Sequence, residues 1–309
     1  MTTLLYSHPA CIEHDPGEYH PERPDRLRAV MAGLEAEKFQ HLHRLEAPIV
    51  DLAEVKRVHK SDYVDMIMDN VPTEGRVRLD PDTAMSPKSG EASQRAAGAG
   101  VAAVDAVINK QARNAFCAVR PPGHHAESSQ AMGFCLFNSA ATAAFHARAK
   151  HGLERVCVID FDVHHGNGTQ HSFENVEGMF YGSSHQYPAY PGTGSTSERG
   201  KFSNICNLPL APGTGSKGFR EAYEEVMFPA IRNFNPELLI ISAGFDAHIN
   251  DPLAQLELAT EDYRWVTDKL LDIAYDVCDG RVVSMLEGGY DLDALRDSVV
   301  VHVQSLMEH

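Results

Sequence analysis

The sequence lacks the features that mark membrane-spanning, secreted and nucleic-acid-binding proteins. No stretch approaches 18 consecutive apolar residues, and no basic segment followed by an apolar one opens the chain, so neither a membrane span nor a secretory signal is expected. The formal net charge is −16 and no basic cluster offsets it, which disfavours binding to nucleic acid or to anionic membranes. We therefore expect a cytoplasmic protein with neither kind of partner.

Cysteine is scarce and has no recognisable pairing pattern. The six cysteines include no CxxC pair, and most lie in apolar runs, which is typical of reduced core thiols. With 43% hydrophobic and 23% charged residues the composition is that of a folded globular protein, which excludes disorder, collagen and coiled coil as the main state. Histidine, in contrast, is abundant at 17 residues, and this favours metal binding or proton transfer.

Short apolar runs alternate with segments of helical spacing along the chain. The runs are rich in β-formers and are bounded by Gly or Pro; they cover 116–119, 156–159, 205–210, 238–241 and 282–286. Helical spacing occurs over 23–38, 90–110, 138–150, 219–233, 261–278 and 291–307. Buried strands that alternate with helices predict an α/β fold, a single three-layer domain over residues 1–309 with a mostly parallel sheet covered by helices on both faces.

Polar residues whose side chains can bind metal or transfer protons follow four of these runs. Open parallel sheets bind ligands beyond the carboxyl ends of their strands, so these segments are the first place to look for a site. They read RPPGHH at 120–125, DFDVHHGN at 160–167, SAGFD at 242–246 and EGGY at 287–290.

The alternation in DFDVH predicts a metal site. In an extended segment Asp160, Asp162 and His164 lie on the same side of the chain. Carboxylate oxygens and an imidazole suit Zn²⁺ or Fe²⁺ with one position open for water. A salt-bridged loop is the alternative for this motif alone, but Asp246 at the end of a separate run favours the metal.

Two further segments offer groups for proton transfer. His124 and His125 follow two prolines and a glycine, and a neutral imidazole near pH 7 is a suitable base for activating water. Tyr290 follows two glycines, which allow its hydroxyl to approach a site and to donate to an oxyanion. Taken singly, the histidines could be ordinary surface or core residues, and the tyrosine could be packing.

Together the motifs resemble those of the zinc-dependent histone deacetylase family. The resemblance runs from Ser7 to Tyr290 and rests on RPPGHHA at 120–126, GFCLFN at 133–138, DFDVHHGNGTQ at 160–170, YPGTG at 190–194, AGFDAH at 243–248 and EGGY at 287–290. It implies the arginase/deacetylase fold, with a narrow channel leading to a single Zn²⁺. Asn167 stands where the short nuclear-type enzymes have aspartate, so the chain is similar to the class II branch and to bacterial histone deacetylase-like amidohydrolases. An amide supports an imidazolium less well than a carboxylate does, so we expect His125 to be less basic.

The resemblance also assigns roles to individual residues. The implied ligands of one catalytic Zn²⁺ per chain are Asp162, His164 and Asp246. The implied catalytic groups are His124, His125, Tyr290, Asp160 and Asn167. The implied substrate contacts are Asp82, Gly133, Phe134, Tyr190 and Leu253. Structural K⁺ is expected near Asp160, His164 and Ser183.

The implied reaction is hydrolysis of an acetyl or related acyl group from a lysine-type amine, with attack by metal-activated water and release of acetate. The partner would be an acetylated lysine peptide or protein, or an acetylated small amine. Leu253 stands where polyamine-selective members carry an acidic residue, which favours acyl-lysine. The alternatives are an acetylpolyamine deacetylase, a binuclear arginase-like hydrolase using His248 and Asp251, and a non-enzymatic acyl-lysine binder. Acyl-chain preference and assembly into a homo-oligomer are left open.

Overall fold

A computed structural model of the protein describes residues 2–309. Across these residues eight strands form one sheet in the order β2-β1-β5-β10-β9-β6-β7-β8, and every neighbouring pair is parallel. The strands are β1 (Thr3–Ser7), β2 (His43–Glu46), β5 (Asn114–Cys117), β6 (Val156–Asp160), β7 (Met179–Gln186), β8 (Ile205–Leu210), β9 (Leu238–Ala243) and β10 (Val282–Leu286). Two short strands, β3 (Val77–Arg78) and β4 (Ala84–Met85), form a separate antiparallel pair.

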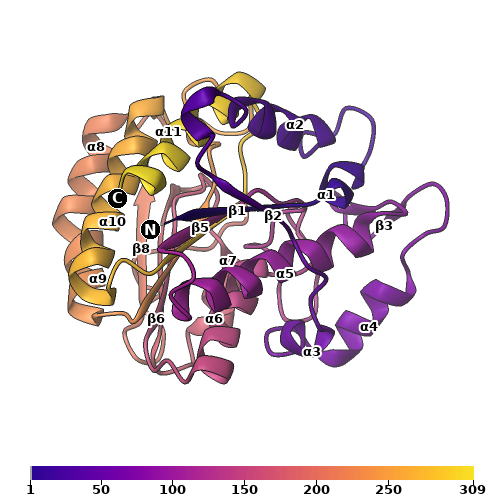
Figure 1. The fold of residues 1–309 in the computed structure, drawn as a ribbon, viewed down its shortest axis with the longest axis horizontal. Coiled ribbons are helices and arrows are strands. Elements are labelled where there is room, and N and C mark those ends of the chain that lie inside the picture. Colours follow the sequence, from indigo (N-terminus) through magenta and orange to yellow (C-terminus); the bar gives the residue numbers. More distant parts are fainter. Residues whose placement is uncertain (1) are drawn as a thin grey trace.

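Helices cover both faces of the sheet. The two long helices α5 and α6 pack on one face, and α10 and α11 pack on the other, where α8 and α9 lie beside them (Figure 1). The helices are α1 (Pro9–Glu13), α2 (Pro24–Gly33), α3 (Leu52–Val55), α4 (Ser61–Asp69), α5 (Ser89–Ile108), α6 (Ser139–His151), α7 (Asn167–Phe173), α8 (Ser216–Ala222), α9 (Phe228–Phe234), α10 (Thr260–Cys278) and α11 (Leu292–Glu308). This arrangement confirms the predicted three-layer α/β fold.

The central strands are buried along their whole length. Every residue of β5, β6, β9 and β10 is buried, which explains why these strands read as continuous apolar runs rather than as alternating patterns. The strand predicted over 116–119 is in fact Asn114–Cys117, so its last two predicted residues already lie beyond the sheet.

One predicted helix is shorter than expected, and another changes its helix type along its length. The segment 23–38 is helical only to Gly33, where a side chain would collide with Arg296 of α11. The segment 219–233 is divided by a π-helical turn at Tyr223–Met227, between α8 and α9. Within residues 2–309, no helix has both the length and the apolarity needed to cross a bilayer.

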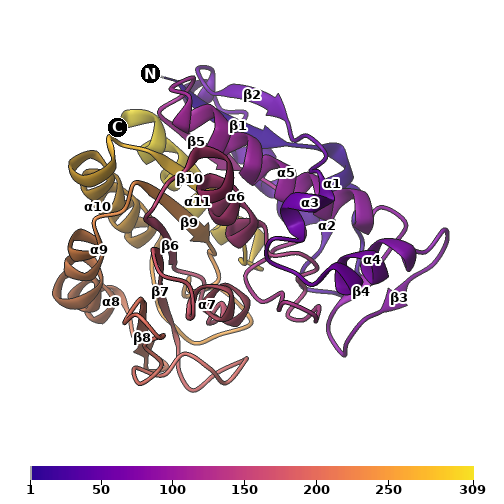
Figure 2. The same ribbon diagram turned by 90° about the horizontal axis from the view of Figure 1, so that it is seen from below.

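The sheet order brings the four motif segments together. They follow β5, β10, β9 and β6, which are consecutive neighbours in the sheet. The two ends of the described chain also lie side by side (Figure 2), where the Thr3 hydroxyl donates to the carbonyl of Leu306 at 3.1 Å. The motif segments therefore meet at the carboxyl edge of the sheet, whereas Thr3, at the start of β1, lies at the opposite edge.

Candidate active site

Two carboxylates and an imidazole converge beyond the ends of β6 and β9. The possible ligand atoms of Asp162, His164 and Asp246 all lie within 4.8 Å of one another. His164 Nδ1 is 3.1 Å from Asp246 Oδ2 and 3.3 Å from Asp162 Oδ1. The peptide N–H of Val163 donates to Asp246 Oδ1, and that of Gly288 donates to Asp162 Oδ2, so the backbone of the loops after β6 and β10 fixes the carboxylates.

The charge balance of this cluster fits a divalent cation. Burial, together with the charge of Asp162, raises the pKa of Asp246 to about 7. Burial alone would also raise the pKa of Asp162, but His124 and His164 lower it. Burial opposes protonation of His164, yet its hydrogen bonds to both carboxylates raise its pKa to about 10. A buried pair of carboxylates with an imidazole needs positive charge, and this donor set is one that Zn²⁺ accepts.

The tandem histidines have different partners. His124 Nδ1 lies 2.9 Å from Asp160 Oδ2. Burial lowers the pKa of His124, but the charges of Asp160 and Asp162 raise it by more, so this pKa is well above its usual value. His125 Nδ1 lies 2.8 Å from Asn167 Oδ1. Burial, and then the charges of His124 and His164, lower the pKa of His125 well below the usual value. The sequence predicted a less basic His125 because its partner is an amide, whereas burial is the main cause of the lowered pKa.

The orientation of Asn167 follows from a residue that sequence reasoning missed. Asn167 Nδ2 lies 2.5 Å from Glu127 Oε1, which in turn lies 2.7 Å from Nδ1 of His171. A carboxylate can only accept from an amide, so Asn167 Oδ1 must face His125. Neutral His125 then carries its proton on Nδ1 and keeps the Nε2 lone pair free. The one signal in the sequence was an acidic residue directly after the His-His-Ala segment.

The loop that carries Tyr290 is held from two sides. Its peptide N–H donates to Asp251 Oδ2 at 2.7 Å, and the Arg26 guanidinium lies over its ring, 4.8 Å from the centroid. Arg26 also donates to the carbonyls of Glu287 and Gly289. Burial raises the pKa of Tyr290 well above its usual value, so the phenol remains a donor at neutral pH.

Arg26 belongs to a buried ion-pair network beneath the site. Its guanidinium donates to Glu22 at 3.0 Å, and Arg120 pairs with the same carboxylate. All three side chains are fully buried. The sequence predicted no role for this network, because Arg120 is distant in the chain from Glu22 and meets it only in the fold.

A narrow cavity connects these groups to the surface. Its volume is about 170 Å³, and its walls are Asp82, His125, Gly133, Phe134, His164, Tyr190, Leu253 and Tyr290. The five residues expected to contact substrate all lie in this wall. Gly133 has φ +56°, and a side chain there would collide with the ring of His125, so glycine is required at this position.

The aromatic rings of the wall pack edge to face. Phe134 lies 5.8 Å from Tyr290, and Tyr190 lies 5.2 Å from His125, measured between ring centroids. The peptide N–H of Gly133 donates to Asp82 Oδ1 at 3.2 Å, which ties the mouth of the cavity to the β3–β4 loop. The cavity is therefore apolar along its sides and polar at its floor and mouth.

The additional ligands of the binuclear alternative have other partners. Asp251 accepts peptide N–H groups of Leu253, Tyr290 and Asp291. His248 Nδ1 accepts the peptide N–H of Asn250, and its Nε2 lies 3.3 Å from the Thr260 hydroxyl. Within the described chain, neither residue joins the ligand group around Asp162.

Comparison with known proteins agrees with this geometry. The family model for the histone deacetylase domain matches residues 20–306. Histone deacetylase 14, chloroplastic, of Arabidopsis thaliana is 39% identical over 98% of this chain and 76% of its own length. Polyamine deacetylase HDAC10 of Homo sapiens is 35% identical over 99% of this chain and 46% of its own length.

A solved structure extends the similarity to the whole fold. The crystal structure of the HDA15 HD domain matches with a TM-score of 0.94 and 35% identity, covering 100% of this chain and 90% of that one. The match of the family model over nearly the whole chain, together with the likeness of the fold, shows that the protein belongs to the histone deacetylase family, whose members are hydrolases.

Proposed function

We propose that the protein is a zinc-dependent deacetylase that removes acetyl or related acyl groups from lysine side chains and releases acetate. The observation that carries the proposal is a single one. One cavity of about 170 Å³ is lined by His164 of the candidate metal-ligating group, by His125 and by Tyr290. Such a cavity suits a long, thin substrate whose reactive group lies at the end of an alkyl chain.

Asp162, His164 and Asp246 would hold the metal. When bound, Zn²⁺ supplies a Lewis acid that polarises the amide carbonyl and activates water. The remaining chemistry belongs to side chains of this protein. Tyr290 donates from Oη to the substrate oxygen as negative charge develops on it.

The two histidines divide the proton transfer between them. His125 has a lowered pKa and a free Nε2, so it accepts the proton from water and later delivers it to the leaving amine. His124 has a raised pKa and remains a cation paired with Asp160, so it stabilises negative charge in the site. Neighbouring groups with pKa values moved in opposite directions are typical of acid–base catalysis.

The mouth of the cavity supports acyl-lysine as the substrate. Leu253 is 41% exposed there and offers no charge to a second amine of a polyamine. Asp82 lies opposite and would accept peptide N–H groups of a bound substrate. Structural K⁺ near Asp160, which pairs with Ser183 across β6 and β7, stays a prediction, as do the cytoplasmic location and assembly into a homo-oligomer.

The proposal is tested by measuring acetate release and bound metal on the same sample. The purified protein is assayed side by side with acetyl-lysine peptides and acetylated polyamines, and its metal is measured by elemental analysis. We expect acetate from the peptides, and loss of both metal and activity in Asp246→Ala. Full activity in metal-free protein, or acetate release from polyamines alone, would contradict the proposal.

A further inference from the structure

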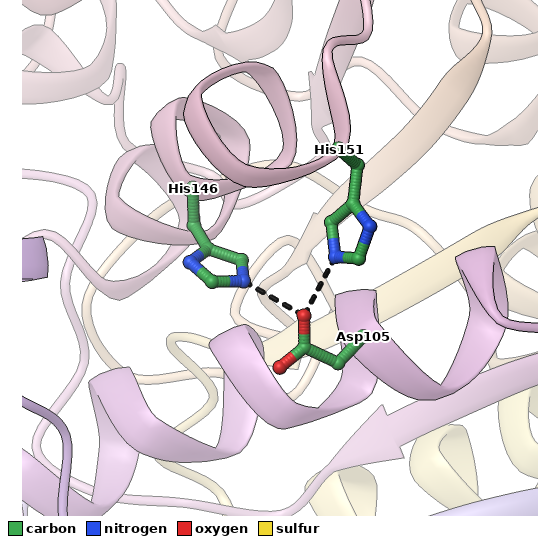
Figure 3. A group of neighbouring side chains, drawn as sticks. All are labelled: Asp105, His146 and His151. Carbon is green, nitrogen blue, oxygen red and sulfur yellow. Dashed lines mark hydrogen bonds and ion pairs between the residues drawn. The ribbon is translucent and has the colours of Figure 1, made fainter.

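Two histidines and an aspartate converge at a second place, far from the cavity. His146 and His151 lie near the end of α6, and Asp105 lies in the last turn of α5 (Figure 3). His146 Nε2 is 2.8 Å and His151 Nε2 is 2.6 Å from the same oxygen, Asp105 Oδ1. All three donor atoms lie within 4.8 Å of one another. The deacetylase chemistry uses none of these residues.

A second carboxylate determines which nitrogen of His146 is free. Glu54 of α3 lies 3.0 Å from His146 Nδ1, on the far side of the ring from Asp105. A carboxylate accepts only, so Nδ1 carries the proton, and neutral His146 directs the Nε2 lone pair at Asp105. A lone pair and a carboxylate oxygen repel each other unless a proton or a metal ion lies between them. A carboxylate behind a histidine is also the usual support of a metal-ligating imidazole.

The position of the cluster in the fold favours a cation. α5 ends shortly before β5 begins, and α6 ends shortly before β6 begins, so both helices present their carboxyl ends at the same edge of the sheet. This edge is opposite the one that carries the active site. The carboxyl ends of helices have partial negative charge, which adds to that of Asp105, whereas the charge of Glu54 is already paired with Arg57 and Lys150.

Access and geometry also suit a bound ion. The side chains of Asp105 and His151 are 46% and 15% exposed, while that of His146 is 7% exposed. Zinc bonds to nitrogen and oxygen of about 2.0–2.2 Å require donors roughly 3.4 Å apart at a tetrahedral ion. Each histidine nitrogen lies 2.6–2.8 Å from Asp105 Oδ1, which is closer than this, so the half-exposed Asp105 would have to move outward to accommodate an ion. Solvent would fill the remaining position.

We propose that Asp105, His146 and His151 form a second Zn²⁺ site, which joins α5 to α6 and is independent of the catalytic centre. The ion would replace the protons that otherwise separate the two imidazoles from the carboxylate. Its role is structural, because the described cavities do not connect this cluster with the catalytic groups. Two nitrogen donors and one carboxylate favour Zn²⁺ over Mg²⁺ or Ca²⁺, which prefer oxygen.

The test counts zinc in the holoenzyme. Protein loaded at the catalytic site is titrated with Zn²⁺ by calorimetry, and metal is measured after desalting. Unmodified protein should bind a second equivalent, and His151→Gln should bind it at least tenfold more weakly while retaining the first equivalent and its deacetylase activity. His41→Gln, which changes an exposed histidine away from the cluster, is the matched control and should behave like the unmodified protein.

A second variant tests whether misfolding, rather than loss of a ligand, weakens zinc binding. Asp105→Asn preserves the shape of the side chain and removes the charge, so it too should weaken the second equivalent while the thermal unfolding of the metal-free protein stays close to normal. The proposal is overturned if unmodified protein binds one zinc in the presence of excess Zn²⁺. It is equally overturned if His151→Gln and Asp105→Asn retain normal affinity for the second equivalent.

Discussion

Two adjacent histidines of this chain have opposite acid–base properties although they share one rigid loop. The difference lies in their partners, because His124 faces the carboxylate of Asp160 and His125 faces the amide of Asn167. Both partners were predicted from the family resemblance and not from residue types and spacing alone. The sequence could not predict Glu127, which orients the amide, or Arg26, which packs on Tyr290, because only the folded chain brings these groups together.

Tyr290 provides a test of catalysis that leaves metal binding intact. Its phenol remains protonated and is not in the ligand group, so its contribution should arise in the transition state. We expect Tyr290→Phe to fold, to retain its metal and to bind acetyl-lysine peptide, with kcat lowered by about 10²- to 10³-fold, or roughly 2.7–4 kcal/mol. Steady-state kinetics and metal analysis check this. A near-normal kcat would show that Tyr290 only lines the cavity and does not stabilise the transition state.

Leu253 provides a test of selectivity. A carboxylate at the cavity mouth should pair with the second amine of an acetylated polyamine and contribute about 1–3 kcal/mol. Leu253→Glu should therefore raise kcat/KM for acetylspermidine relative to an acetyl-lysine peptide. Ile249→Glu is the control, because Ile249 is exposed nearby but lies outside the cavity wall. The same shift in both variants would mean that the added negative charge, and not its position at residue 253, sets selectivity.

At the scale of elements, the sequence predicted strands best where most of their residues are apolar. The runs at β6, β8, β9 and β10 were found with small errors at their ends. Three strands of the eight-stranded sheet were missed, as were the short strands β3 and β4. β2 is short and largely exposed, β7 ends in the polar run from Ser183 to Gln186, and β1 lies next to the start of the chain without a preceding turn. Their strand conformation depends on pairing with neighbours rather than on local pattern.

The loop after β10 depends on the absence of a side chain at Gly288. A Cβ there would collide with the carboxylates of Asp246 and Asp162, and the peptide N–H already donates to Asp162. We expect Gly288→Ala to displace the carboxylates, so that bound metal and activity fall together, as measured by elemental analysis and acetate release. Gly218→Ala in α8, where the nearest neighbour is the movable side chain of Thr214, should keep both. Retention of metal in Gly288→Ala would show that the loop can relax.

At the scale of the whole molecule, the net charge of −16 should attract positively charged substrates. A negative protein attracts positively charged peptides over about 10 Å at 0.1 M salt, and added salt screens this attraction. We expect KM for an acetyl-lysine peptide with flanking lysines to rise between 50 mM and 500 mM salt. KM for a peptide with neutral flanks should change little. Equal salt dependence of the two peptides would argue against long-range attraction.

The position of β10 has a consequence for how the chain is made. β10 is the last strand along the chain but lies in the middle of the sheet, between β5 and β9. Before residues 282–286 leave the ribosome, the earlier strands can form only two half-sheets, β2-β1-β5 and β9-β6-β7-β8, with facing edges that have no partner. Unpaired strand edges promote aggregation, so we expect chaperones to assist folding of the nascent chain. Because Tyr290 follows the same strand, no shorter nascent chain contains the complete set of proposed catalytic groups.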